Sequence, residues 1–297
     1  MSTRRIEGRR EIAPGRSAYW QAWLPQCPTQ DPSQGPIRAS VVMVHGLHEH
    51  SARYAHVGTR LATAGFATYA ADHRGHGRSD GRPANIERMA LIVEDLGSFV
   101  HFALERHPGL PVFMVGHSLG GLIALQYATE AKAVLDGLVV SGPTVQVLAG
   151  SALARRLAGL LSAVVPNLGV VPIDDQKISR DPEVVRAYRA DPLVYHGKVK
   201  ARTGAEMLVT MEGLPSRLGR LSLPLLLLHG TEDQICALAG SVMVHDAVSS
   251  PDKTLHRYQG LYHEVFNEPE REAILTDLVS WLTEHLPTNR GAPHSAG

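Results

Sequence analysis

The stretch that decides the fold is Pro111-Val-Phe-Met-Val-Gly-His-Ser-Leu-Gly-Gly121. An apolar run leads into the pattern G-x-S-x-G, and a helical pattern over Leu119–Glu130 follows directly. A serine on such a sharp strand-to-helix turn presents its hydroxyl at the helix N-terminus, where backbone N–H groups and the helix dipole favour a developing anion. Gly116 and Gly120 lack a Cβ, so neighbouring backbone can approach the turn closely. The context therefore predicts a nucleophile, Ser118, rather than a glycine-rich turn with an incidental serine.

The same alternation of short apolar runs and helical patterns extends along most of the chain. Continuously apolar runs are typical of strands buried on both faces, as in a parallel sheet covered by helices. The predicted inner strands are Ser40–Val44, Phe66–Ala71, Pro111–Val115, Leu138–Val140, Pro224–Leu228 and Leu255–Tyr258, with edge strands near Glu11 and over Trp20–Leu24. The predicted helices are Ile92–His107, Leu119–Glu130 and Glu270–Leu286. Strand followed by helix, repeated, predicts a doubly wound α/β fold, with a mostly parallel sheet and helices on both faces.

The segment 143–215 interrupts this alternation. Between Gly142 and Leu223 we predict helices and loops but no strand. We therefore divide the chain into a discontinuous core, 1–142 and 216–297, and an inserted helical cap, 143–215; the tail 287–297 is expected to be disordered. A stripe at helical spacing in the cap has two open interpretations: a helix facing the core, which we favour, or a face bordering a substrate tunnel. The stripe consists of Leu153, Leu157, Leu160, Leu161 and Val164.

Composition limits the partners and the location. Lys and Arg number 29 and Asp and Glu number 29, so the net charge is zero and no nucleic-acid partner is predicted. No apolar region follows the N-terminal arginines, so we predict no secretory signal. The longest uncharged apolar-rich run, Leu157–Ile173, is interrupted by prolines and too short to span a bilayer. We expect a soluble cytoplasmic protein whose cap could touch a membrane surface transiently.

A serine nucleophile needs a base, and the base needs an orienting acid. When the serine lies on this kind of turn, the chain order is serine, acid, histidine. Among 16 histidines, His263 follows the last predicted strand and shortly precedes the last helix, so we predict it as the general base. Asp233 ends the turn after the strand Pro224–Leu228, and we predict it as the acid. Its neighbour Glu232 is the alternative, since either carboxylate could accept from an imidazole.

Acyl transfer also needs donors for the oxyanion of the tetrahedral intermediate. We predict the backbone N–H groups of Leu119, which follows the nucleophile, and of Leu47, in the loop after the first parallel strand. No cofactor and no metal ion are predicted. The histidines within His45–His50 stand at the first, fourth and sixth positions, which does not reproduce the H-x-H-x-D-H spacing of metallo-hydrolases.

Several separated motifs resemble those of the monoacylglycerol lipase family and its lysophospholipase-like relatives in the α/β-hydrolase superfamily. They are His45–Tyr54, Asp72–Gly81, Gly116–Gly121, Tyr262–Glu268 and, in the cap, Val165–Leu168 and Tyr188–Leu193. The resemblance extends from Ile37 to His285. It implies an α/β-hydrolase fold with a cap over an apolar acyl tunnel. It also implies cleavage of the single fatty acyl ester of a monoacylglycerol to glycerol and free fatty acid, through an acyl-enzyme.

The resemblance further implies that Glu49, Arg53 and Tyr188 build the polar, glycerol-binding end of the site. Glu49 and Arg53 stand four residues apart, so they could instead pair only with each other. His48 occupies a position where family members often carry glycine, and an imidazole there could narrow the polar pocket. Cys236 resembles a cysteine that some members have close after the acid. The interpretation we favour is that it is simply a small buried residue.

Other functions are compatible with part of this pattern. A lysophospholipase, a general carboxylesterase, a thioesterase or a perhydrolase could use the same triad, because fold and triad do not fix the substrate. A non-catalytic binding protein of this fold would usually have lost a triad member, and none is missing. Acyl chain length and oligomeric state are not predicted.

Overall fold

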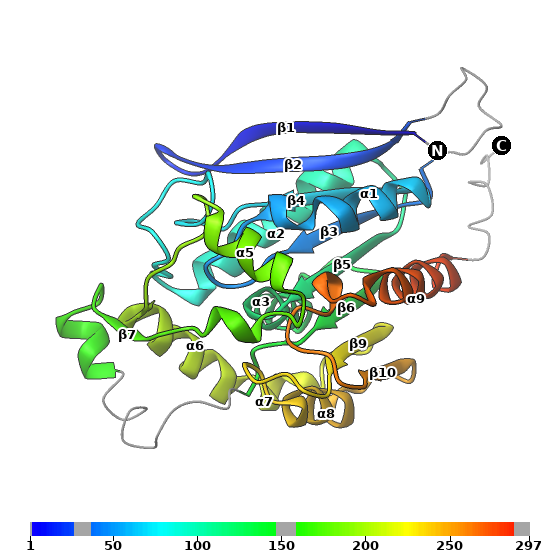
Figure 1. The fold of residues 1–297 in the computed structure, drawn as a ribbon. Coiled ribbons are helices and arrows are strands. Elements are labelled where there is room, and N and C mark those ends of the chain that lie inside the picture. The colour runs from blue at the N-terminus through cyan, green and yellow to red at the C-terminus, as the bar shows by residue number, and fades with distance from the viewer. Residues whose placement is uncertain (1, 27–36, 147–158, 288–297) are drawn as a thin grey trace, which may run out of the picture.

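The structure, a computed structural model, describes residues 2–26, 37–146 and 159–287 (Figure 1). Within these residues, eight strands form one sheet in the order β1-β2-β4-β3-β5-β6-β9-β10. β1 (Ser2–Ala13) and β2 (Arg16–Gln26) form a hairpin, and β2 pairs antiparallel with β4 (Phe66–Ala71). The other neighbours pair in parallel; they are β3 (Ala39–Val44), β5 (Val112–His117), β6 (Gly137–Ser141), β9 (Leu225–Gly230) and β10 (Lys253–Tyr258). The predicted doubly wound α/β fold is confirmed.

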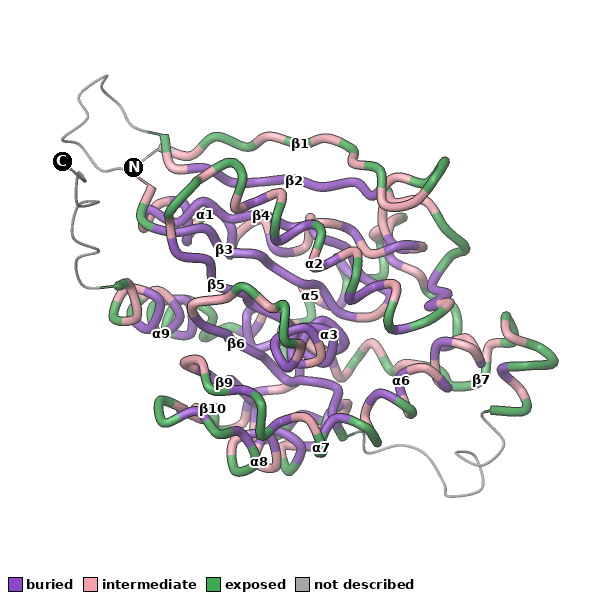
Figure 2. The backbone as a smooth tube through the Cα atoms, turned by 180° about the vertical axis from the view of Figure 1, so that it is seen from behind, coloured by how far each residue is buried: buried purple, intermediate pink, exposed green. Residues whose placement is uncertain are grey.

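Helices cover both faces of the sheet because its inner strands are apolar on both sides. Val42 and Val44 of β3 share one hydrophobic cluster with α2 (Met89–Arg106) and α3 (Leu119–Ala128). Val41 and Met43 share the other with α1 (Ala55–Thr63) and α9 (Arg271–Glu284). Successive side chains of a strand point to opposite faces, so a continuous apolar run fills both layers. Figure 2 shows the inner strands buried along most of their length.

The predicted elements differ from the observed ones mainly at their ends. Helix α2 begins at Met89, before the predicted Ile92, and α3 ends at Ala128 rather than Glu130. The short 3-10 helices η1 (Ser51–Tyr54) and η3 (Val265–Asn267), and α8 (Leu238–Ala247), complete the core. Helix ends fray, and the apolar pattern that locates a helix does not fix its last turn.

The segment that follows β6 contains short elements. They are a helix over 159–164, β7 (Gly169–Val171), η2 (Asp175–Lys177), α5 (Pro182–Ala190), β8 (Val199–Lys200) and α6 (Ala201–Gly213), before α7 (Pro215–Leu218). The prediction that this segment holds no strand is wrong, because β7 and β8 pair antiparallel. Strands this short cannot show a period-two pattern in the sequence.

Hydrogen bonds tie this segment to loops that follow the parallel strands. The Tyr195 N–H donates to the His48 carbonyl after β3, at 2.9 Å. The Glu264 N–H, after β10, donates to the Ile178 carbonyl at 2.8 Å. Loops after parallel strands meet at one edge of the sheet. The segment therefore packs along the edge at which Ser118 lies.

The apolar stripe of the sequence does not face the core where the structure describes it. Leu160 is 62% exposed and Val164 is 69% exposed, so the favoured interpretation is wrong for these two residues. Ser162 is the buried residue of this turn, and its carbonyl accepts from the Arg202 guanidinium at 3.2 Å. Periodicity reveals an apolar face but not what lies opposite it. Two further stripe residues, Leu153 and Leu157, and the tail 288–297 lie outside the described residues.

Candidate active site

Ser118 lies on a strained turn between β5 and α3. Its φ is 55° and its ψ is −120°, in a region that few residues other than glycine adopt. A Cβ at Gly116 would come within 2.5 Å of the Gly120 carbonyl oxygen, and one at Gly120 would clash with the Val44 carbonyl oxygen. Gly116 therefore lets the start of α3 pack closely on β5, and Gly120 lets the turn pack against β3. The sharp turn predicted from G-x-S-x-G is present.

Three side chains from separate loops form one hydrogen-bonded chain. His263 Nε2 lies 2.9 Å from Ser118 Oγ, and His263 Nδ1 lies 2.7 Å from Asp233 Oδ2. Nδ1–H donates to the ionised carboxylate, which leaves Nε2 to accept the serine proton. His263 follows β10 and Asp233 follows β9, so adjacent parallel strands bring them together. The arrangement matches the geometry of a nucleophile, a base and an orienting acid.

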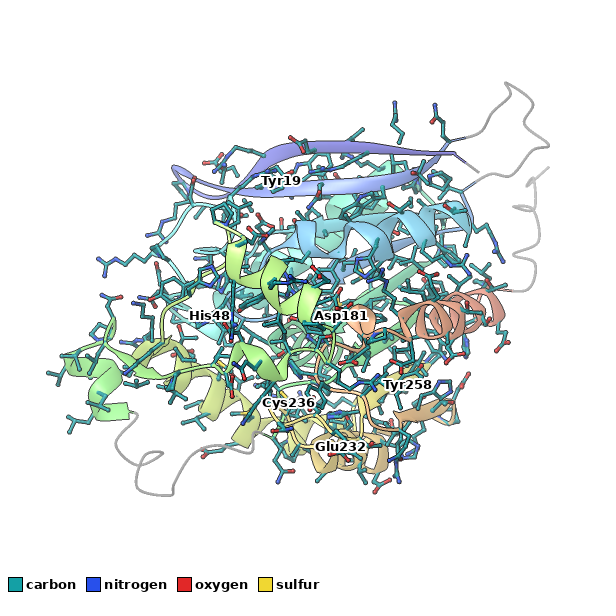
Figure 3. All side chains as sticks on the ribbon, viewed as in Figure 1. Tyr19, His48, Asp181, Glu232, Cys236 and Tyr258 are labelled. Atoms are coloured by element: carbon teal, nitrogen blue, oxygen red, sulfur yellow. The ribbon has the colours of Figure 1, made fainter. Side chains whose placement is uncertain are left out.

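Asp233, and not Glu232, lies beside the histidine. Glu232 is exposed (Figure 3), whereas Asp233 is buried and its Oδ1 accepts from the N–H groups of Ile235 and Cys236 at 2.8 and 2.9 Å. His229, which is fully buried, places its Nε2 3.3 Å from Asp233 Oδ2. Sequence reasoning missed His229 as a contact of the acid. Its position at the end of β9, four residues before Asp233, was the available signal.

The electrostatics of this chain favour a charged aspartate beside a basic imidazole. Burial alone would raise the pKa of Asp233, but the charge of His263 and hydrogen bonds from His229, His263 and the Cys236 N–H hold it well below its usual range. Burial alone would lower the pKa of His263, but the Asp233 carboxylate raises it above its ordinary value. A more basic imidazole takes the serine proton more readily.

The loop after β3 approaches the serine closely. A Cβ at Gly46 would lie 3.2 Å from the Cβ of Ser118, so only glycine fits there without displacement. The Gly46 N–H donates to Glu49 Oε1 at 2.6 Å, which fixes the loop immediately before Leu47. On the other side of Ser118, Leu119 is the first residue of α3. Both peptides predicted as oxyanion donors therefore border the serine.

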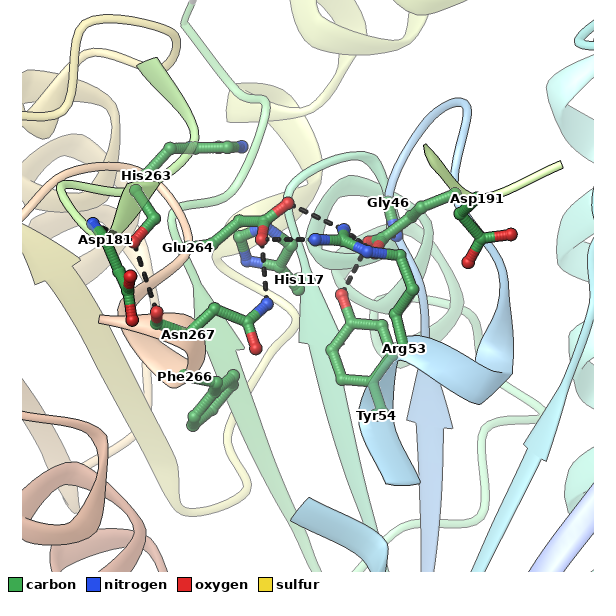
Figure 4. A network of polar contacts seen from close by, with 12 residues as sticks. Gly46, Arg53, Tyr54, His117, Asp181, Asp191, His263, Glu264, Phe266 and Asn267 are labelled. Carbon is green, nitrogen blue, oxygen red and sulfur yellow. Dashed lines mark hydrogen bonds and ion pairs between the residues drawn. The ribbon is translucent and has the colours of Figure 1, made fainter. Parts of the chain in front are cut away.

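A buried ionic network supports this loop (Figure 4). Arg53 donates to Glu49 Oε2 at 2.7 Å and makes two 2.7 Å hydrogen bonds to Glu264, the residue after His263. Tyr54 OH donates to Glu49 Oε1 at 2.6 Å. Burial opposes ionisation of Glu264, but the Arg53 guanidinium lowers its pKa to about 2. The pairing of Glu49 with Arg53, which the sequence left as an alternative, is present.

Tyr188 belongs to the same cluster. The guanidinium carbon of Arg53 lies 4.8 Å from the centroid of its ring, within range of a cation–π contact. Tyr188 is on α5 and is buried. The structure thus brings Glu49, Arg53 and Tyr188 together, as the resemblance implied.

Comparison with known proteins identifies the family. Residues 35–270 match the hydrolase family described as serine aminopeptidase, S33. A monoacylglycerol lipase of Mycolicibacterium smegmatis is 42% identical over 273 residues, which are 92% of this chain and 95% of the relative. The chain belongs to the monoacylglycerol lipase-like α/β-hydrolases. Human monoglyceride lipase is 32% identical over 280 residues, 93% of this chain and 90% of the relative. A Paleococcus ferrophilus monoacylglycerol lipase structure is 30% identical at a TM-score of 0.77, over 96% of this chain and all of that one.

As a member of this family, the chain is a serine hydrolase of carboxylic esters, as the sequence predicted. Among the described residues, no helix is long and apolar enough to cross a membrane. The same residues hold no group of three or more His, Cys, Asp or Glu side chains placed to bind a metal ion.

His48 stands where the resemblance leads us to expect a glycine. Its φ is 67°, a left-handed conformation that glycine adopts at little cost and a side chain does not. The ring of His48, which is labelled in Figure 3, is buried. It lies beside Tyr195, with ring centroids 4.9 Å apart. Burial lowers the pKa of His48 to about 3, so the ring is neutral near pH 7.

Cys236 and Thr144 lie behind the nucleophile. Thr144 Oγ1 lies 3.2 Å from Ser118 Oγ and 3.5 Å from Cys236 Sγ. Cys236 is fully buried, as favoured from the sequence, and burial raises the pKa of its thiol, so the thiol stays protonated. Sequence reasoning missed Thr144, because a threonine in a loop carries no spacing signal.

Proposed function

We propose that Ser118, His263 and Asp233 form the catalytic triad of this hydrolase. The observation that carries the proposal is the continuous chain of hydrogen bonds from Ser118 Oγ through His263 to Asp233. His263 Nε2 takes the proton of Ser118 as Oγ attacks the ester carbonyl. The N–H groups of Leu47 and Leu119 stabilise the oxyanion of the tetrahedral intermediate.

Collapse of this intermediate breaks the ester bond, and His263 returns its proton to the leaving alcohol oxygen. The acyl group stays on Ser118. A water molecule, deprotonated by His263, then attacks the acyl-enzyme through a second tetrahedral intermediate and releases the fatty acid. Asp233 stabilises the imidazolium that forms in both halves of the reaction.

The proposed substrate is a monoacylglycerol, cleaved to glycerol and a free fatty acid. The proposal is supported by relatives of that name that match nine-tenths of the chain. Residues 143–215 act as the cap over a core of 1–142 and 216–297, which shields the acyl chain from water. Glu49, Arg53 and Tyr188 form the polar wall for the glycerol end. Glu49 and Arg53 are hydrogen-bonded to each other. They therefore fix the shape of this wall, in addition to contacting the substrate.

The proposed location is the cytoplasm, with transient contact between the cap and a membrane. Exposed apolar side chains gather in one part of the cap, where Leu160, Val164 and Leu168 are 62%, 69% and 51% exposed. Exposed apolar groups of this kind insert at the boundary between headgroups and acyl chains. A monoacylglycerol partitions into the same boundary.

The substrate proposal predicts a graded dependence on acyl length. Each CH₂ buried at the transition state contributes about 0.8 kcal/mol, or roughly fourfold in kcat/KM, until the apolar site is filled. We expect kcat/KM to rise from short to long monoacylglycerols and to fall for triacylglycerols, whose bulk does not fit beneath a cap. Steady-state assays in matched detergent measure this, with p-nitrophenyl acetate as the control for triad competence. Faster hydrolysis of triacylglycerol would reject the proposed substrate, and faster hydrolysis of lysophosphatidylcholine would favour a lysophospholipase.

The raised pKa of His263 predicts the acid limb of the pH profile. Only the neutral imidazole accepts the serine proton, so activity is lost as the pH falls through the pKa of His263. Because Asp233 raises this pKa, the midpoint of the limb in kcat/KM should lie above the ordinary histidine value of about 6.5. In Asp233→Asn the midpoint should move to lower pH and kcat should fall. An unmoved midpoint for an uncharged ester would contradict the role of Asp233.

A further inference from the structure

A polar groove of about 510 Å³ lies apart from the proposed triad, where the core meets the 159–203 segment. Four arginines line it: Arg16 at the start of β2, Arg82 and Arg88 from the loop before α2, and Arg202 from α6. The turn between β1 and β2, the loop over 82–88 and the segment over 159–171 lie at the same end of the molecule in both views (Figures 1 and 2).

The groove carries more positive charge than its carboxylates can neutralise. Arg16 pairs with Glu87 at 3.0 Å, and Arg202 lies 4.0 Å from Glu206. Among the described residues, no side chain pairs with the guanidinium of Arg82 or Arg88, and both residues are exposed. The net charge of the whole chain is zero, so this excess is local.

Exposed apolar side chains adjoin the groove. Pro166 is part of the wall of the groove. The backbone N–H of Arg202 donates to the Pro166 carbonyl at 3.0 Å. On either side of Pro166 in the chain, Val165 is 39% exposed and Leu168 is 51% exposed, and Val164 precedes them at 69%. Guanidinium groups beside exposed aliphatic side chains match the chemistry of an anionic bilayer, in which phosphates lie directly above the acyl boundary.

We propose that this arginine groove binds the phosphate groups of anionic phospholipids and thereby orients the cap on the membrane. The planar guanidinium donates two parallel hydrogen bonds to a phosphate, which makes arginine well suited to this anion. The proposal rests on the proposed contact of the cap with a membrane and adds the lipid class that is recognised. A nucleic acid fits less well, because the apolar side chains that border the arginines would remain exposed to water.

Vesicle binding by the full chain tests the proposal. The double variant Arg82→Gln/Arg88→Gln removes the two unpaired charges and leaves both ion pairs intact. Its affinity for vesicles of phosphatidylcholine mixed with phosphatidylglycerol should fall by roughly fivefold per arginine, measured by co-sedimentation. Binding to pure phosphatidylcholine should not change. The matched control is Arg220→Gln/Arg257→Gln, which removes two exposed arginines outside the groove and should bind as the wild type does.

Three outcomes would overturn the proposal. The first is an unchanged affinity of the double variant for phosphatidylglycerol vesicles, and the second is an equal loss in the control variant. The third is binding of a free anion in place of a membrane. In that case calorimetry would show that glycerol 3-phosphate or an RNA oligonucleotide binds to the wild type but not to the double variant, while both proteins bind vesicles equally. Hydrolysis of monoacylglycerol in detergent micelles, measured in parallel, should be equal in all variants. If the wild type did not hydrolyse monoacylglycerol, the proposed substrate would be refuted, but the result of the vesicle assay would still stand.

Discussion

Replacing Ser118 with alanine is expected to lower kcat by about 10⁴–10⁶ while the fold stays intact. In the proposed mechanism this hydroxyl forms the acyl-enzyme, and it is the hydroxyl that faces His263 Nε2, at 2.9 Å. His263→Ala should cost about as much, because an unassisted serine is a poor nucleophile. The double variant should be little worse than either single one, since the residues act as a unit. Steady-state kinetics on a long monoacylglycerol and on p-nitrophenyl acetate measure these losses.

Ser98→Ala is the matched control for the serine replacement. Ser98 is exposed on α2 and accepts a hydrogen bond from Arg10, so its loss should leave kcat unchanged. Circular dichroism and thermal unfolding establish that each variant is folded. A folded Ser118→Ala enzyme that keeps wild-type turnover would refute the mechanism. Glu232→Gln proving more damaging than Asp233→Asn would refute the choice of acid.

Replacing Arg53 with methionine is expected to lower the free energy of unfolding by about 3–5 kcal/mol, because it leaves buried carboxylates without their cation. Arg53 makes hydrogen bonds to Glu49 and Glu264, and both carboxylates are almost fully buried. The expected fall in Tm is roughly 6–20 °C. Catalysis should suffer as well, because Glu49 accepts from the Gly46 N–H in the loop that borders Ser118.

Two variants sharpen this prediction. Arg53→Met/Glu264→Gln removes one of the stranded charges and should recover part of the lost stability. Arg5→Met breaks an ion pair of similar length, Arg5 with Glu7 at 2.9 Å, in which both side chains are about half exposed. A surface pair of this kind contributes at most about 1 kcal/mol. Calorimetry measures the free energy of unfolding of each variant. If Arg53→Met and Arg5→Met lowered it equally, the buried network would contribute no more stability than a surface ion pair.

The parts of the site that sequence reasoning located are those with local signals. G-x-S-x-G between a strand and a helix identified Ser118, and chain order then left His263 and Asp233 as its candidate partners. The Arg53–Glu264 contact could not be found in this way. Its residues are 211 positions apart, and only the folded chain brings the loops after β3 and β10 together.

Two other features depended on tertiary context. The spacing of Leu160 and Val164 revealed an apolar face, but the same spacing describes a core helix and an exposed one. The resemblance leads us to expect a glycine where His48 stands, but only the φ of 67° gives a physical reason why glycine would suit that position. The arginine groove was also hidden, because Arg16, Arg82 and Arg202 are scattered along a chain with no net charge.

Active-site labelling tests the central claim most directly: that Ser118 is the residue acylated by a monoacylglycerol. The probe is a monoacylglycerol analogue in which a phosphonyl fluoride replaces the ester carbonyl, and peptide mass spectrometry locates the adduct. We predict one adduct per enzyme, on Ser118, formed in step with loss of activity and slowed by excess monoacylglycerol. The Ser118→Ala variant should not be labelled. An adduct on another residue, such as Cys236, or full inactivation with Ser118 unmodified, would contradict the account.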